Sequence, residues 1–481
     1  MLRRSRELAS ASKPHSVTVR SMELDLLVIG SGPSGQKAAI QAAKLGKRVA
    51  VAERKERLGG VSIHTGTIPS KTLREAVLEQ LAQRPLDVLD PTRIEESEAA
   101  VLQQLMDRTA RVVAAETAVV REQFRRNRVG LLPGQAYFVD ANTVKMEGDD
   151  EPIRAHRIVI ASGTNPARPP SVSFDDRTVI DSDGLLKLEH HVPRSMIVVG
   201  AGVIGVEYAS MFGALGTKVT VIDKRDRVLN FLDAEIGEAF QYLLRRSNVT
   251  FRLRESVAAV DIDADARGPR VLLESGKELV AETVLYAVGR QGDTAKLQLD
   301  KAGLEADSRG RIPVDETHRT AVPHIFAVGD VAGGGLAATA MEQGRIATLH
   351  AFGESVQTLP DLVPTGVYAI PEIAMVGRTE EQLTDEAVPY VTGVARWSEL
   401  ARGLMSGDED GMLKLLVSTE ERCVLGVHVI GTGATDLVHI GQAVMGGAST
   451  IDFLVTAVFN YATFAESYKV AALDAANRIR G

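Results

Sequence analysis

The sequence predicts an α/β fold with two Rossmann-like βαβ units and a C-terminal α+β domain. The first observation is a short apolar run, 24–29, which leads through a glycine-rich turn and an Ala-rich helical stretch to a second apolar run ending at Glu53. The second observation is a recurrence of this pattern from 196 to Asp223. The third is a change of texture near Leu359, after which strand-like runs alternate with a helix. At 481 residues the chain is long enough for several domains.

Both glycine-rich turns have the G-x-G-x-x-G spacing of dinucleotide-binding proteins; the glycines are Gly30, Gly32, Gly35, Gly200, Gly202 and Gly205. In this motif the first glycine permits a tight turn, the second lets a pyrophosphate approach the backbone, and the third lets helix pack on strand. The helix N-terminus then presents N–H groups and partial positive charge to the phosphates. Glu53 and Asp223 end the second strands, where a carboxylate can accept hydrogen bonds from ribose hydroxyls. Two such motifs predict two dinucleotide sites.

Hydrophobic periodicity predicts the other elements. The stretch 94–127 lacks Gly and Pro and spaces its apolar residues as a helix does, so we expect one long helix there. The stretch 250–280 alternates in the manner of strands, with a turn near 265–269. In the C-terminal domain we expect strands at 367–370, 412–417 and 424–430 and a helix at 436–445.

Composition excludes several classes of function. Lys and Arg total 55 against 63 Asp and Glu, a net charge of −8 without any long block of like charge, which argues against binding to nucleic acid or an acidic membrane. The apolar stretch 196–216 contains Glu207 and five glycines, so a buried strand and helix explain it better than a membrane span. The ten histidines show no metal-ligand spacing, and we expect no metal site.

The chain has one cysteine, Cys423, which excludes an intramolecular disulfide and a Cys-rich metal site. We expect Cys423 to be a buried small apolar residue in a strand, and we expect a cytoplasmic protein. Residues 1–21 are rich in Arg and Ser but lack the apolar stretch of a secretory signal. We expect a disordered extension ahead of a start near Met22, with an amphipathic organelle-targeting peptide as the alternative.

Together these motifs resemble those of the two-dinucleotide-fold flavoprotein disulfide reductases, along nearly the whole chain. The first unit is similar to that family's FAD site and the second to its nicotinamide site. The segment 320–330 resembles the second FAD fingerprint, in which Asp330 would bind a ribityl hydroxyl. The resemblance implies an FAD-binding domain, an NAD(P)-binding domain and a dimerisation domain that forms a homodimer. These domains would span 22–170 with 295–358, then 171–294, and then 359–481.

The segment 59–71 distinguishes this chain from the reductases, because Ser62 and Thr67 stand where those enzymes have their two redox cysteines. Hydroxyl groups titrate far above the range of a thiolate and cannot cycle through a disulfide. The reductases' C-terminal His-Pro-Thr…Glu corresponds here to 461–466, so Tyr461 replaces the histidine base and Glu466 is retained. The dithiol relay is absent.

Within the superfamily, the segments 66–77 and 459–473 are similar to the soluble pyridine nucleotide transhydrogenases. Those enzymes also have Thr at the second cysteine position and Tyr where the reductases have the base. This chain departs from them at Ser62, where they usually keep a cysteine, and at Ala462, where they usually have proline. Neither departure removes a group that hydride transfer needs.

The resemblance implies a ping-pong exchange of hydride between NADPH and NAD⁺ through FAD at a single nicotinamide site. Lys71 would lie near flavin N5 and pair with Glu207, which raises the electrophilicity of the ring. Tyr461 would either hydrogen-bond near the flavin pyrimidine edge or fill the space of the histidine. The same resemblance implies further cofactor contacts at Gly60, Thr67, Lys71, Gly163, Gly289, Gly329, Asp330 and Ala337.

The choice between NAD and NADP depends on the end of the second unit. Asp223 should favour the free 2′-hydroxyl of NAD and repel the 2′-phosphate of NADP. Lys224, Arg225 and Arg227 follow closely and could offset that repulsion by charge-assisted contacts. An acid followed by three cations suits the use of both nucleotides, although the basic run could equally be a solvated turn.

Two alternative functions share these motifs. The first is an NAD(P)H:quinone or dye reductase of the same fold. The second is a non-catalytic FAD-binding protein, a decayed reductase, although such a scaffold would not need the intact glycines of the second unit.

Overall fold

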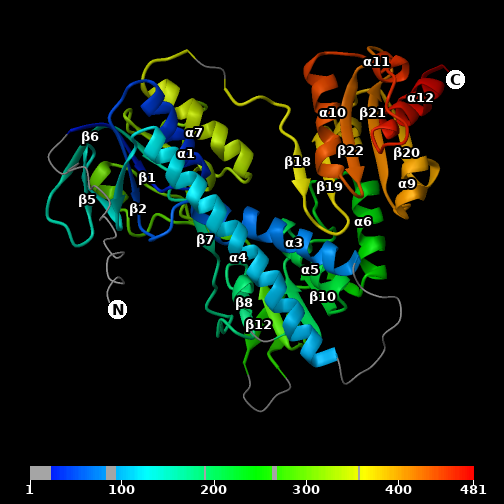
Figure 1. Ribbon diagram of the computed structural model, residues 1–481, viewed down its shortest axis with the longest axis horizontal. Helices are drawn as coiled ribbons and strands as arrows, with labels where there is room; N and C mark the ends of the chain where they lie inside the picture. The colour runs from blue at the N-terminus through cyan, green and yellow to red at the C-terminus, as the bar shows by residue number, and fades with distance from the viewer. Residues whose placement is uncertain (1–22, 83–93, 189–190, 263–267, 356–357, 481) are drawn as a thin grey trace, which may run out of the picture. The chain divides into compact units, whose positions relative to one another are not determined.

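The computed structural model describes residues 23–82, 94–188, 191–262, 268–355 and 358–480. The predicted extension 1–21 lies outside these residues, as does most of the predicted turn at 265–269. The chain divides into two compact units, each taken by itself below (Figure 1). Unit 1 comprises Met1–Leu58, Val119–Gly163 and Gly292–Val356, and unit 2 comprises Gly59–Ala118, Thr164–Gln291 and Gln357–Gly481.

Unit 1 is built on a mainly parallel sheet in the order β3-β2-β1-β6-β5-β4, with β17 paired to β6. Its strands are β1 Leu24–Ile29, β2 Val49–Glu53, β3 Gly130–Pro133, β4 Ala136–Asp140, β5 Thr143–Met146, β6 Ile153–Ile160 and β17 Ile325–Ala327. The central strands β1 and β2 are buried along almost their whole length, as strands of a parallel sheet covered on both faces are.

Two helices of unit 1 pack side by side, α1 Pro33–Lys44 and α7 Ala337–Ala351 (Figure 1). They approach closely because Gly344 of α7 has no side chain; a Cβ there would lie 2.1 Å from the carbonyl oxygen of Ser34. The hydroxyl of Thr348 also donates to the carbonyl oxygen of Ala38, at 3.2 Å. The pair therefore ties the start of the chain to a segment about three hundred residues later.

The half of unit 2 for which the sequence predicts nucleotide binding, called the nucleotide-binding half, has a parallel sheet in the order β11-β10-β9-β15-β8. Its strands are β8 Val179–Asp181, β9 Ser195–Val199, β10 Lys218–Asp223, β11 Val249–Leu253 and β15 Thr283–Tyr286. A three-stranded sheet joins β12 Val257–Asp261, β13 Arg270–Leu273 and β14 Glu278–Val280, and a two-stranded sheet joins β7 Thr164–Pro166 and β16 Arg290–Gly292. Short strands therefore fill the predicted stretch 250–280.

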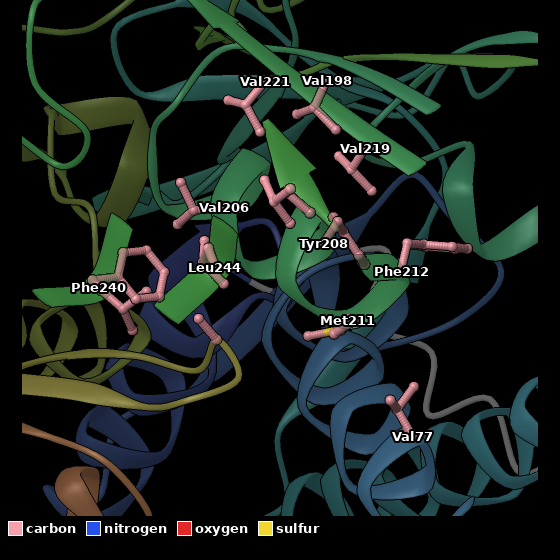
Figure 2. Close-up of a cluster of buried hydrophobic side chains, with 14 of the residues drawn as sticks. Val77, Val198, Val206, Tyr208, Met211, Phe212, Val219, Val221, Phe240 and Leu244 are labelled. Carbon is pink, nitrogen blue, oxygen red and sulfur yellow. The ribbon is translucent and has the colours of Figure 1, made fainter. Parts of the chain in front are cut away.

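The helices of this half are α2 Gly60–His64, α3 Thr67–Ala82, α5 Val203–Leu215 and α6 Ala234–Arg246. Figure 2 shows their core, in which Tyr208, Met211 and Phe212 of α5 lie among side chains of the sheet, with Val77 contributed by α3. Because α5 is buried nearly all round, its apolar composition is that of a core helix. None of the described helices is long and apolar enough to cross a membrane. The long helix α4, Ile94–Arg126, confirms the helix predicted at 94–127.

The C-terminal half of unit 2 is an antiparallel sheet in the order β18-β19-β22-β21-β20 with helices packed on it. Its strands are β18 Thr365–Val367, β19 Ile373–Gly377, β20 Tyr390–Arg396, β21 Met412–Ser418 and β22 Val424–Ile430. Its helices are α8 Glu380–Asp385, α9 Ala401–Ser406, α10 Ala434–Gly446, α11 Ile451–Thr456 and α12 Glu466–Arg480. This arrangement confirms the predicted α+β domain. Short 3₁₀ turns complete the chain at Leu185–Lys187, Leu299–Ala302, Gly329–Ala332 and Trp397–Glu399.

Two predictions in this half are wrong in detail. The strand predicted at 367–370 ends at Val367, because the N–H groups of Tyr368 and Ile370 donate to Glu207 and Ser210 of α5 instead of a neighbouring strand. Cys423 precedes β22 and is half-buried, where its thiol contacts the Glu421 carboxylate at 3.5 Å. Burial and this carboxylate raise the pKa of the Cys423 thiol, which keeps it protonated at neutral pH.

A buried ammonium group joins the two halves of unit 2. Lys414 of β21 is fully buried, and its Nζ lies 2.9 Å from Asp233, 3.0 Å from Glu235 and 2.9 Å from Glu380. Asp233 also caps α6 by accepting the Glu235 N–H. Burial alone would raise the pKa of Asp233, but the hydrogen bond from Lys414 and nearby positive charge outweigh it and lower that pKa. These acids stand close enough to hold a metal ion, and Lys414 already supplies the compensating charge.

Replacing Lys414 by Met should therefore lower the free energy of unfolding by about 3–5 kcal/mol, because three carboxylates lose their buried counter-charge. Urea denaturation of the two proteins measures the difference. Lys277→Met, which breaks an exposed pair with Glu255, is the matched control and should change little. The stabilisation of the fold by ionised Asp233 is fully present above the ordinary carboxyl pKa. It is lost as the pH falls through the lowered pKa that Asp233 has in the folded protein. Equal effects of the two variants would contradict this role of Lys414.

Candidate functional site

The three glycines of the loop in unit 1 differ in the space around them. Gly30 has a φ of +107°, and a Cβ there would lie 2.3 Å from the carbonyl oxygen of Ala161 on the neighbouring strand's end. A Cβ on Gly35 would lie 2.0 Å from the carbonyl oxygen of Gly30, so the helix could not pack against the turn. At Gly32 a Cβ would meet no atom within 4 Å. The loop is therefore closed around Gly30 and Gly35 and open at Gly32, which leaves space for a phosphate.

The glycine loop of unit 2 repeats this arrangement. Gly200 has a φ of +110°, and its Cβ would lie 2.7 Å from the carbonyl oxygen of Ala287. The Cβ of Gly205 would lie 1.9 Å from the carbonyl oxygen of Gly200, and that of Gly202 would meet nothing within 4 Å. No side chain of the described residues caps α1 or α5, so the N–H groups of both helix ends are available to phosphate oxygens. Both loops thus fit the pyrophosphate of a dinucleotide.

The acid at the end of each second strand is bound to its own loop. Glu53 accepts the Ser31 N–H at 3.0 Å and the Ser31 hydroxyl at 2.6 Å. Asp223 accepts the Ala201 N–H at 2.7 Å. Each carboxylate also accepts the N–H two residues further on, from Lys55 and from Arg225. This places both acids beside the helix N-terminus, where a ribose attached to the pyrophosphate would lie.

The two acids differ in their counter-charge. The Arg225 guanidinium binds Asp223 through two further hydrogen bonds, 2.9 Å from Nε to Oδ1 and 2.7 Å from Nη2 to Oδ2. Burial alone would raise the pKa of Asp223, but the bonds from Arg225 and Ala201 outweigh it and lower that pKa, so the carboxylate stays ionised. The charge that would repel a 2′-phosphate is therefore already neutralised by Arg225.

The other two cations of the basic run differ in their surroundings. The Nη1 atom of Arg227 lies 3.7 Å from Oε1 of Glu381. Lys224 is exposed and forms no hydrogen bond or ion pair with the described residues. Of the three cations, Lys224 is thus the one that could contact a 2′-phosphate without first leaving a carboxylate.

The predicted second fingerprint of unit 1 lies against α1. Gly329 has a φ of +75°, and a Cβ there would lie 2.7 Å from the hydroxyl oxygen of Ser34 in the first turn of α1. Asp330 follows it in the turn Gly329–Ala332, and Ala337 begins α7. The Ser162 hydroxyl, one residue past the Ala161 carbonyl that Gly30 faces, is buried without a hydrogen-bond partner among the described residues. Unit 1 thus gathers polar groups around one open loop, which is the arrangement an extended dinucleotide requires.

The structure brings Lys71 of α3 and Glu207 of α5 into direct contact. The Lys71 Nζ lies 2.6 Å and 2.7 Å from the two Glu207 oxygens, and Glu207 is only 3% exposed. The Tyr368 N–H also donates to Glu207, at 2.9 Å, and the Lys71 ammonium lies 4.8 Å from the centre of the Tyr368 ring. The lysine is therefore held with its charge at a fixed point. Sequence reasoning missed Tyr368, because no motif marks a residue so far along the chain from both partners.

The remaining predicted residues occupy loops and helix ends of unit 2. Gly60 begins α2, Thr67 begins α3 and is exposed, and Gly289 has a φ of +83°. Tyr461 is 76% exposed, and Glu466 begins α12 with one buried carboxylate oxygen that has no partner among the described residues. Within the described residues no hydrogen bond or ion pair joins Tyr461 or Glu466 to Lys71 or Glu207.

Comparison with known families matches both parts of the chain. The pyridine nucleotide-disulphide oxidoreductase family matches residues 24–344, and the dimerisation domain of the same family matches residues 363–472. A protein of Mycobacterium tuberculosis named soluble pyridine nucleotide transhydrogenase is 53% identical over 464 residues, which are 95% of this chain and 98% of that protein. One of the same name from Erwinia tasmaniensis is 44% identical over 470 residues, which are 96% of this chain and 99% of that protein.

Solved structures show the same architecture. The HOCl-induced flavoprotein disulfide reductase RclA from Escherichia coli superposes with a TM-score of 0.83 at 26% identity, covering 93% of this chain and 99% of that one. LpdA from Mycobacterium tuberculosis superposes with a TM-score of 0.84 at 26% identity, covering 94% of this chain and 99% of that one.

The open space at Gly202 leads to a direct test of the second loop. A methyl group at this position should leave the fold intact, because in the described part of the chain no atom beyond the neighbouring residues lies within 4 Å of it, but it should collide with a bound pyrophosphate. We expect Gly202→Ala to weaken NADPH binding at least roughly tenfold with an unchanged melting temperature. Fluorescence titration and thermal unfolding measure the two quantities.

Gly446→Ala is the control for that variant, because it also adds a methyl group in open space, at the exposed end of α10. It should change neither quantity. Undiminished NADPH binding by Gly202→Ala would exclude this loop as the nucleotide site.

Proposed function

Because the chain belongs to the pyridine nucleotide-disulphide oxidoreductase family, we propose that it transfers hydride between NADPH and NAD⁺ through bound FAD, as a soluble pyridine nucleotide transhydrogenase. One observation carries this proposal: two intact dinucleotide loops occur in a chain with hydroxyl residues at Ser62 and Thr67. A disulfide reductase needs a thiol pair there, and the single Cys423 cannot supply one.

The residues of unit 1 fit FAD. The open loop at Gly32 and the N-terminus of α1 would bind its pyrophosphate, Glu53 its ribose, and Asp330 its ribityl chain. Gly163, directly before β7, and Ala337, at the start of α7, complete the proposed contacts. When bound, the flavin supplies a centre that accepts a hydride and gives it up again.

The residues of unit 2 would bind NADPH and NAD⁺ in turn. The loop Gly200–Gly205 takes the pyrophosphate, Asp223 the adenosine ribose, and Gly289 lies on the turn after β15. Because Arg225 neutralises Asp223, the same pocket can accept either a hydroxyl or a phosphate at the 2′ position. One site that accepts both nucleotides permits a ping-pong exchange.

Lys71 is proposed to place a fixed positive charge at the flavin. Glu207 holds the Lys71 ammonium in position, since two short contacts join the ammonium to the carboxylate. A preoriented charge assists transfer because it needs no reorganisation when the electron distribution changes. Gly60 begins α2, Thr67 begins α3, the helix that carries Lys71, and both are proposed as further contacts.

The C-terminal half of unit 2 is proposed to form a homodimer. It matches the family's dimerisation domain, and it exposes Val458 and Tyr461, which are 95% and 76% exposed in the single chain. The Glu466 oxygen that is buried without a partner among the described residues lies on the same segment. A second chain that covers Val458 and Tyr461 and donates a hydrogen bond to Glu466 would account for all three, and we propose that Tyr461 and Glu466 act in the assembled dimer. The single unpaired cysteine is in keeping with a cytoplasmic place of action.

Mixing the FAD-loaded protein with NADPH and thio-NAD⁺, whose reduced form absorbs at a distinct wavelength, tests the proposed function. Prompt reduction of thio-NAD⁺ is expected, whereas lipoamide and glutathione disulfide should not be reduced. Turnover seen only with an added quinone would replace the proposal by a quinone reductase, and failure to bind FAD would reject both.

Lys71→Met should slow flavin reduction by NADPH roughly tenfold or more in a single turnover, because the fixed charge is lost. Stopped-flow absorbance at the flavin band measures the rate. Lys44→Met, a substitution at an exposed position at the C-terminal end of α1, provides the control. A rate equal to that of the unaltered protein would remove Lys71 from the mechanism.

Arg225→Ala should raise the KM for NADPH more than that for NADH, because it exposes the charge of Asp223 to the 2′-phosphate. We expect the KM for NADPH to rise roughly tenfold more than the KM for NADH. Lys224→Ala should change the two KM values in the same direction as Arg225→Ala. Steady-state assays with each nucleotide provide the values. An equal change in KM for NADPH and for NADH would show that Arg225 only stabilises the structure of the loop.

A further inference from the structure

Unit 1 contains a pocket at the opposite end of its parallel strands from the glycine loop. Its volume is about 400 Å³, within the ordinary range for small-molecule sites. The wall is formed by Arg157 of β6, the segment before and within β17, and the end of α7; the lining residues are Arg157, Arg319, Pro323, Phe326 and His350–Gly353. The proposed function uses none of these residues.

The position in the fold separates this pocket from the proposed FAD contacts. Helix α7 starts at Ala337, a proposed cofactor contact, and ends at Ala351, in the pocket wall. Its 15 residues span about 22 Å at 1.5 Å per residue. Strand β6 runs in the opposite direction, from Arg157 in the pocket wall toward Ile160, which pairs with Ile29 just before the glycine loop. The pocket therefore lies at the amino ends of the parallel strands, whereas the loop lies at their carboxyl ends.

The charge of the pocket is positive in a protein whose net charge is −8. No carboxylate is among the lining residues, and two guanidinium groups are. The Arg319 guanidinium forms no hydrogen bond or ion pair with the described residues and lies 5.8 Å from the centre of the Phe326 ring. Asp315, the acid that acts on Arg319 electrostatically, accepts the backbone N–H groups of Thr317 and Arg319.

The other polar groups add to this charge. Arg157 donates from Nε to the Ala351 carbonyl at 3.0 Å and from Nη1 to the His156 carbonyl at 2.9 Å, which leaves its Nη2 without a partner among the described residues. The Lys47 ammonium lies 5.0 Å from the centre of the Phe352 ring, beside the wall. The Nε2 atom of His350 is buried and has no hydrogen-bond partner in the described part of the chain.

We propose that this pocket binds a phosphate monoester of about mononucleotide size. A guanidinium fork matches phosphate oxygens, and Arg319 and Arg157 both retain free donors for them. Pro323 and Phe352 provide an apolar wall for a planar group attached to the phosphate. The site takes a ligand independently of hydride transfer.

The test is calorimetric titration of AMP into the FAD-loaded protein saturated with NAD⁺, so that both dinucleotide loops are filled. We expect one AMP per chain, and Arg319→Gln should weaken its binding roughly tenfold or more. Arg154→Gln is the control, since Arg154 is an exposed arginine of β6, the strand that carries Arg157, and does not line the pocket. Arg319→Lys, which keeps the charge but not the fork, should give an intermediate affinity.

Three outcomes would overturn the proposal. Equal affinity in Arg319→Gln and the unaltered protein would show that the pocket is not the site. Loss of the AMP signal on saturation with NAD⁺ would place AMP at the glycine loop of unit 2. Equal binding of adenosine would show that the phosphate is not recognised. Reduction of thio-NAD⁺ by the same Arg319→Gln protein reports the proposed function separately and should be unchanged.

Discussion

The closeness of each glycine loop to the strand beside it is the constraint on which the rest of the structure depends. Gly30 faces the Ala161 carbonyl and Gly200 faces the Ala287 carbonyl at separations that exclude any Cβ. These contacts aim the N-termini of α1 and α5 at the space beside Gly32 and Gly202. The proposed FAD and nicotinamide sites depend on these two helix N-termini, because a dinucleotide is held mainly through its pyrophosphate.

Around these loops, the charged groups act by holding one another in place. Asp223 is bound by Arg225, and Lys71 is bound by Glu207, so each charge is fixed by a partner from the same unit. The pair of Asp223 and Arg225 reduces the discrimination between the 2′-hydroxyl of NAD and the 2′-phosphate of NADP. The pair of Lys71 and Glu207 keeps an ammonium group at one point. Hydride exchange requires little more from the protein than orientation and a preset electrostatic field, since the cofactors carry the reaction. This agrees with the absence of thiols at Ser62 and Thr67.

Lys414 has a comparable part in the architecture of unit 2. It lies in a sheet of the C-terminal half and compensates Asp233, which caps α6 in the nucleotide-binding half. The buried pair of Lys414 and Asp233 tolerates little displacement, because separation of the two would leave a charge uncompensated in a medium of low polarity. The nucleotide-binding half and the C-terminal half are thereby coupled through one side chain.

The sequence alone determined the elements whose signals are local. The two βαβ units, the long helix α4 and the strands β21 and β22 follow from periodicity, and the missing dithiol follows from the identity of two residues. Only the tertiary structure decided that Tyr368 joins Lys71 and Glu207, that Arg225 covers Asp223, and that Arg157 and Arg319 line one pocket. It also ended the strand predicted at 367–370, because side chains of α5 take the N–H groups that a ladder would use. Periodicity reports which face of an element is buried, whereas a contact between distant segments depends on how those faces pack, and no local pattern encodes that.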